Sequence, residues 1–164
     1  MKLDSNTISV SGKELAGLVK ATCKKGFPFK FKARGGSMSP FICDGDSVVV
    51  EPLSPHGQFN VGDIVACKVP ENGRLIIHRI IDKKNTQFLI KGDNVLDADG
   101  FFDKKDIYGI IKIIIPQKTG SFFHRKSREV GLYLGRMNKS IAFLSRYKIL
   151  LPMCRIASKF LSFC

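Results

Sequence analysis

The stretch RGGSMSP, from Arg34 to Pro40, surrounds one serine with residues that shape a backbone. Two glycines precede Ser37, and glycine lets the main chain come close to another molecule and present its N–H groups. Pro40 stiffens the turn that follows. A serine hydroxyl is a weak nucleophile unless a base takes its proton. Ser37 is therefore a candidate nucleophile, on condition that the fold brings a base to it.

Three histidines could supply that base, and their settings differ. His56 lies in the loop SPHGQ and His124 in a basic segment, whereas His78 interrupts the apolar run LIIHRII. An imidazole inside an apolar strand needs a polar partner, and histidine titrates near neutrality, as a general base should. A lone strand histidine is more often a satisfied core residue, so His78 becomes a base only in combination with Ser37.

A carboxylate would complete such a site by fixing the histidine tautomer and stabilising the imidazolium. The loop KGDNVLDADG contains three candidates, Asp93, Asp97 and Asp99. Acidic loops are usually solvated turns, and the residues alone do not choose among the three. The five cysteines include no C-x-x-C pair, so no zinc site is indicated, and neither a metal nor an organic cofactor is expected.

Four segments, GGSMSPFICDGD, VGDIVACKV, LIIHRII and FLIKGDNVLDADG, follow one another in the order and approximate spacing of the type I signal peptidase superfamily. The chain resembles the endoplasmic-reticulum and archaeal branch, in which histidine replaces the lysine base of most bacterial signal peptidases and of the self-cleaving SOS repressors. The resemblance covers residues 29–116. It implies a Ser37 nucleophile and a His78 base.

The same resemblance assigns the acidic residues of the last box. Its spacing selects Asp99 as the residue that orients the base, with Asp97 as the near alternative because Val95 stands where the family has a second asparagine. Asp93 corresponds to a second required carboxylate. The Gly-Asp pairs at Gly45-Asp46 and Gly62-Asp63 correspond to structural positions of the family.

Two departures from the family and one feature shared with the repressor relatives bear on function. The residues before the serine box do not resemble the membrane anchor of signal peptidases, so no such anchor is expected there. Gly35 stands where many members have a serine that helps to bind the oxyanion, so this role is expected to fall mainly on the Ser37 N–H. The helix-like segment ELAGLVK also contains Ala16-Gly17, the kind of small-residue bond that the repressor relatives cut in themselves.

Hydrophobic periodicity predicts the elements that must position these residues. A Ser11–Glu14 capping box begins a helix whose apolar stripe is Leu15, Leu18, Val19 and Cys23, and which Gly26 and Pro28 end. Six β-branched or alternating runs follow: PFKFKAR, SVVVEP, DIVACKV, RLIIHRII, TQFLIKG and IYGIIKIIIP. Turns are expected at DGD, VGD, ENG and GDN. The predicted fold class is mainly β, an antiparallel signal-peptidase-like core with a short N-terminal helix and C-terminal amphipathic helices.

The basic charge is concentrated at the C-terminal end. The net charge is +13, and residues 116–164 hold ten Lys and Arg residues but only one acid, Glu129. Two apolar stripes, interrupted at Pro152, predict amphipathic helices too broken to cross a membrane. Residues 121–164 could pack on their own domain or dock on an anionic membrane surface. Nucleic acid is the less favoured partner, because no nucleic-acid-binding motif is present.

These observations predict three regions: an N-terminal helical segment (1–27), a catalytic β domain (28–116) and a basic helical tail (117–164). The expected activity is that of a serine endopeptidase, which cleaves an extended peptide or protein segment after small residues, with Gly36, Met38 and Phe41 beside the substrate. The alternative is a catalytically idle protein that its basic tail tethers to anionic surfaces. The expected location is the cytoplasm, because no N-terminal signal is visible, with the tail as the candidate for peripheral membrane attachment.

Overall fold

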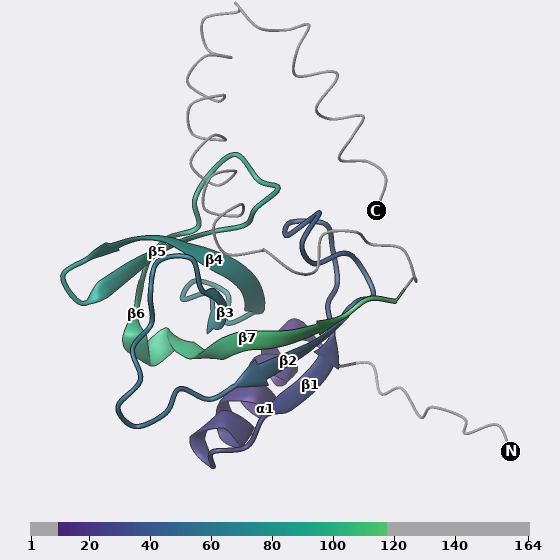
Figure 1. Cartoon of the computed structure of the whole chain (residues 1–164), viewed down its shortest axis with the longest axis horizontal. Helices are drawn as coiled ribbons and strands as arrows, with labels where there is room; N and C mark the ends of the chain where they lie inside the picture. The colour runs from purple at the N-terminus through teal and green to yellow at the C-terminus, as the bar shows by residue number, and fades with distance from the viewer. Residues whose placement is uncertain (1–9, 118–164) are drawn as a thin grey trace, which may run out of the picture.

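The computed structural model describes residues 10–117, which form one antiparallel sheet and one α-helix (Figure 1). The mainly β prediction is confirmed. In chain order the elements are α1 (Gly12–Lys24), β1 (Phe29–Lys32), β2 (Ser47–Glu51), β3 (Ile64–Lys68), β4 (Leu75–Lys84), β5 (Gln87–Lys91), β6 (Gly100–Asp103), a short 3-10 helix (Lys104–Asp106) and β7 (Ile107–Ile115).

Helix α1 begins at the predicted capping box. The Glu14 N–H donates to Ser11 Oγ, and the Ser11 N–H donates to Glu14 Oε2 at 2.8 Å. These bonds from the Ser11 backbone and side chain hold the pKa of the Glu14 carboxyl below its usual value. The buried face is Ala16, Val19 and Cys23. The predicted stripe was wrong for Leu18, which is 47% exposed, because the helix meets the sheet through the small Ala16 instead.

The strand order in the sheet is β1-β2-β7-β3-β4-β5-β6. The last strand, β7, therefore lies between β2 and β3 and joins two halves of the sheet that are made earlier in the chain. Figure 1 shows α1 against the half formed by β1, β2 and β7, with β5 and β6 at the far end. Every neighbouring pair is antiparallel.

Strand β3 separates two hydrophobic cores. Ile64 and Ala66 face a core that also contains Val19 of α1, whereas Val65 and Cys67 face a second core built around Phe88. Alternate residues of a strand point to opposite faces of the sheet, so a strand between two cores has four consecutive buried apolar residues. This explains why DIVACKV shows a continuous apolar run rather than an alternation.

The six predicted strand runs all form strands, and the four predicted turns lie between elements. The sequence reading missed β6. This strand, GFFD, has two adjacent phenylalanines and follows an acidic turn, so it lacks the apolar-polar alternation that identifies the equally short β1, FKFK. It matters for the site, because β6 pairs with β5 directly after Asp99.

The predicted tail helices within residues 117–164, and with them the proposed membrane contact of residues 121–164, lie outside the described residues. Among residues 10–117, no helix has the length and apolar character needed to cross a membrane.

Candidate active site

Ser37 lies in a loop between β1 and β2 that is closed at its base. The Ala33 N–H donates to the Asp46 carbonyl (2.7 Å) and the Gly45 N–H donates to the Ala33 carbonyl (2.9 Å). Nearer the tip, the Gly35 N–H donates to Asp44 Oδ1 at 2.8 Å. These bonds connect the two ends of the loop, so the serine is held on a defined backbone.

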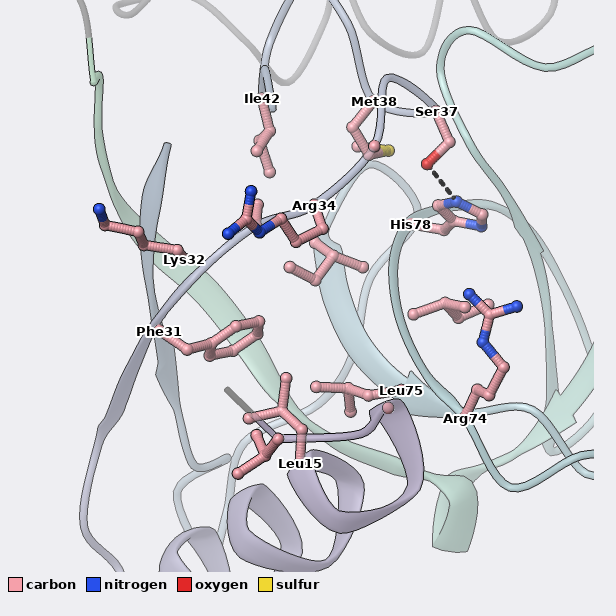
Figure 2. Close-up of a pocket in the computed structure, with 16 residues that line it drawn as sticks. Leu15, Phe31, Lys32, Arg34, Ser37, Met38, Ile42, Arg74, Leu75 and His78 are labelled. Carbon is pink, nitrogen blue, oxygen red and sulfur yellow. Dashed lines mark hydrogen bonds between the residues drawn. The ribbon is translucent and has the colours of Figure 1, made fainter. Parts of the chain in front are cut away.

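His78 approaches Ser37 from β4, where it pairs with Val65 of β3. Its side chain is 9% exposed. The distance from His78 Nε2 to Ser37 Oγ is 2.9 Å, and Figure 2 shows the two side chains directed at each other at one end of a pocket. The structure thus brings together the serine and the histidine that the sequence had paired, although 41 positions separate them.

The third member of the group is Asp99. Its Oδ2 lies 2.6 Å from His78 Nδ1, and its own N–H donates to the Ile90 carbonyl at 2.9 Å, which fixes the residue at the start of β6. Asp97 is exposed in the same loop and has no hydrogen bond or ion pair with His78 among the interactions within residues 10–117. Of the two carboxylates that the sequence left open, the structure places Asp99 against the histidine.

These contacts determine which ring nitrogen of His78 carries a proton. An ionised carboxylate only accepts hydrogen bonds, so the Asp99 contact favours the tautomer with a proton on His78 Nδ1. His78 Nε2 is then the acceptor, and the Ser37 hydroxyl donates to it. The arrangement can remove the hydroxyl proton and stabilise the resulting imidazolium, which is the chemistry of a Ser-His-Asp triad.

Asp93 has a different setting from Asp99. It accepts hydrogen bonds from Arg79 Nε (2.8 Å) and Nη2 (2.7 Å), and both side chains are 1% exposed. Arg79 Nη1 also donates to the Gly62 carbonyl (2.9 Å), and the Phe41 ring lies 5.3 Å from the guanidinium. Because Arg79 follows His78 in β4, this ion pair anchors the strand that carries the histidine.

Sequence reasoning missed Gly92 as a site residue. A Cβ atom at this position would lie 2.7 Å from the Ser37 carbonyl oxygen and 3.0 Å from His78 Nε2. Only glycine leaves room for the serine loop to pack on the loop after β5. Asn94 then ties the loops together, since its N–H donates to the Ser37 carbonyl (2.8 Å) and its Nδ2 donates to the Gly36 carbonyl (3.1 Å). The signal was present in the sequence as the Gly of KGDN.

A pocket of about 430 Å³ extends from Ser37 and His78 between two strand edges. Its walls are Phe31–Gly35 on the β1 side, residues 74–78 at the start of β4, and the N-terminal end of α1. Met38 lines it, as the sequence reading proposed. Gly36 and Phe41 are not among its lining residues, because the Gly36 carbonyl is bonded to Asn94 and the Phe41 ring packs on Arg79.

Other reactive groups near the site are less suited to chemistry. Cys67 on β3 is fully buried, and burial, with a smaller effect of the Asp99 charge, raises the pKa of its thiol. The thiol therefore stays protonated and is not a competing nucleophile. Within residues 10–117, no three His, Cys, Asp or Glu side chains are placed to share a metal ion.

A family of known proteins matches the part of the chain that carries these residues. Residues 13–112 match the family model described as Peptidase S24-like. The match includes the serine loop, β4 and the loop that carries Asp99. None of the curated proteins compared with the chain matches it.

Proposed function

The chain belongs to the Peptidase S24-like family, and on that premise we propose that it is a serine endopeptidase of the signal-peptidase type. Ser37 is the nucleophile, His78 the general base and Asp99 the residue that orients the base. The observation that carries the proposal is the chain of two contacts, 2.9 Å from Ser37 to His78 and 2.6 Å from His78 to Asp99.

Catalysis would begin when His78 Nε2 takes the Ser37 hydroxyl proton as Oγ attacks the scissile carbonyl. The same imidazolium then protonates the leaving amine, and water hydrolyses the acyl-enzyme. The developing oxyanion needs donors. Within residues 10–117 the Ser37 N–H has no hydrogen-bond acceptor, so it is available for this role. With Gly35 in place of a side-chain donor, turnover is expected to be slow.

Two free strand edges support an extended peptide as the substrate. Among residues 10–117, β1 pairs only with β2, and β5 pairs with β4 only from Arg79 onward, so residues 75–78 have one backbone edge that no described strand covers. Both edges face the pocket. A peptide lying between them would add main-chain hydrogen bonds on each side. Small residues before the scissile bond suit the region beside Ser37, where the buried Met38 side chain forms the wall.

The assignment of Asp99 gives a direct test of the triad. We expect Asp99→Asn to lower kcat by roughly 10²- to 10⁴-fold, because an amide does not stabilise the imidazolium and favours the wrong tautomer of His78. Asp97→Asn, which makes the same chemical change two residues away, should leave kcat near the wild-type value. Steady-state cleavage of peptides with a central Ala-Ala bond measures both. An inactive Asp97 variant beside a fully active Asp99 variant would reverse the assignment.

The structure also bears on self-processing at Ala16-Gly17. Ala16 is 2% exposed and lies inside the capped helix α1, whereas a substrate must be extended to reach Ser37. We expect the chain to stay intact at this bond. Intact-mass spectrometry during prolonged incubation checks this, with Ser37→Ala as the control. Fragments that begin at Gly17 in wild-type protein only would contradict it and would show that α1 unfolds into the pocket.

A further inference from the structure

The pocket beside Ser37 has positively charged walls. Lys32, Arg34 and Arg74 line it, and none of its lining residues within the described chain is an aspartate or glutamate. Figure 2 shows Lys32 and Arg34 on the β1 side and Arg74 on the β4 side, with Ser37 and His78 at one end. A peptide in this pocket therefore passes between cations on both sides.

These cations have no carboxylate partners among residues 10–117. The ion pairs of this region involve other basic residues, and Lys32, Arg34 and Arg74 are all exposed. Two nearby acids each accept a hydrogen bond from a backbone group and have no ion pair among these residues: Asp44 accepts from the Gly35 N–H, and Glu14 accepts from the Ser11 N–H. As far as residues 10–117 are concerned, the arginines are thus available to bind a carboxylate.

The positions of the two arginines determine how far from the scissile bond a recognised peptide side chain would lie. Arg34 precedes Ser37 by three residues. Arg74 precedes His78 by four residues and lies directly before the first residue of β4. A strand advances about 3.3 Å per residue, so the Arg74 backbone lies roughly 13 Å along β4 from the base. The Arg74 side chain runs beside the first residue of α1, since a Cβ added to Gly12 would lie 3.6 Å from its Cγ. Arg74 lines the pocket at this point.

We propose that the pocket selects peptides that carry an aspartate or glutamate within about four residues of the scissile bond, and that Arg34 and Arg74 recognise this side chain. The inference rests on the proposed function and names its substrate class. Guanidinium groups bind carboxylates through two parallel hydrogen bonds, which gives a geometric preference that lysines elsewhere on the surface lack.

The first experiment measures cleavage by the full chain. The substrates are twelve-residue peptides of Ser, Thr and Ala with a central Ala-Ala bond, each with one Glu, Gln or Lys at successive positions on either side. We expect Glu at the preferred position to raise kcat/KM about tenfold over Gln, mainly through KM, because the contact is made before and during the reaction alike. Lys at that position should be the poorest substrate. Equal kcat/KM for Glu, Gln and Lys at every position overturns the inference.

Charge reversal assigns the effect to the pocket. Arg34→Glu and Arg74→Glu, singly and together, should abolish the preference for Glu and transfer it to Lys. Lys30→Glu makes a similar change in net charge on β1, but Lys30 does not line the pocket, so this variant should keep the wild-type preference. If Lys30→Glu changes the preference as much as the arginine variants do, the effect comes from the overall charge and the proposed recognition is wrong.

A binding measurement separates this inference from the proposed activity. Ser37→Ala cannot cleave by the proposed route but retains the pocket, so fluorescence anisotropy with the same labelled peptides reports recognition alone. Tighter binding of Glu than Gln peptides that depends on Arg34 and Arg74 supports the inference even if wild-type protein cleaves nothing, in which case the peptidase proposal fails. If wild-type protein cleaves the peptides but Ser37→Ala binds Glu and Gln peptides equally, the peptidase proposal stands and the proposed recognition of acidic residues is wrong.

Discussion

His78→Ala is expected to lower kcat for peptide cleavage by about 10³- to 10⁴-fold, because the Ser37 hydroxyl then has no base within reach. The side chain is almost buried and contacts both Ser37 and Asp99, so its removal disables the whole triad. The double variant Ser37→Ala/His78→Ala should be no slower than either single variant, since residues that act as one unit do not contribute additively.

Two controls make this result interpretable. His56→Ala removes an exposed loop histidine and should leave kcat unchanged. Circular dichroism and the thermal midpoint of His78→Ala establish that the sheet is intact. A folded His78→Ala protein that cleaves peptides at the wild-type rate would exclude the proposed mechanism.

Asp93→Ala is expected to have the largest effect on stability. It leaves the Arg79 guanidinium, which is 1% exposed, without its counterion. Breaking a buried ion pair from one side typically costs about 3–5 kcal/mol of unfolding free energy. Urea denaturation measures this as a lower midpoint at an unchanged slope.

Two further variants test whether Asp93→Ala loses stability because it leaves a charge buried or because it removes contacts. Arg79→Leu/Asp93→Leu removes both charges and should recover much of the stability lost in Asp93→Ala. Asp103→Asn affects a solvent-exposed pair with Lys105 and keeps an oxygen that can accept from Gln87, so it should leave the midpoint nearly unchanged. A wild-type midpoint for Asp93→Ala would show that the Arg79–Asp93 pair does not hold the strand that carries His78.

Much of the fold was predictable because its signals are local. The capping box at Ser11 lies within four residues of chain, and the six recognised strands each carry their own apolar pattern. The insertion of β7 between β2 and β3 was not predictable in this way. It depends on which strand edges are left to pair after the earlier hairpins have formed, and no local pattern encodes that choice.

The candidate site also contains some residues that local sequence identifies and others whose roles depend on long-range strand pairing. Ser37 and His78 could be recognised from local sequence. Ser37 lies among glycines and a proline that shape its backbone, and His78 interrupts an apolar strand in which an imidazole needs a polar partner. Asp97 and Asp99 are the same residue type in one short loop, and the motif spacing favoured Asp99. The pairing of β5 with the unrecognised β6 places Asp99 at the imidazole. Phe41 was assigned to the substrate pocket because its apolar ring follows the serine, whereas the buried Arg79 guanidinium holds that ring elsewhere.

The central place of β7 has a consequence for how the protein is made. Ser37, His78 and Asp99 all leave the ribosome before residues 107–115, yet the sheet that aligns them stays in two halves until β7 joins β2 to β3. A nascent or truncated chain that ends before residue 107 thus contains every proposed catalytic residue and lacks the frame that holds them together. The proposed peptidase activity would then begin only after β7 has been synthesised and has paired with β2 and β3.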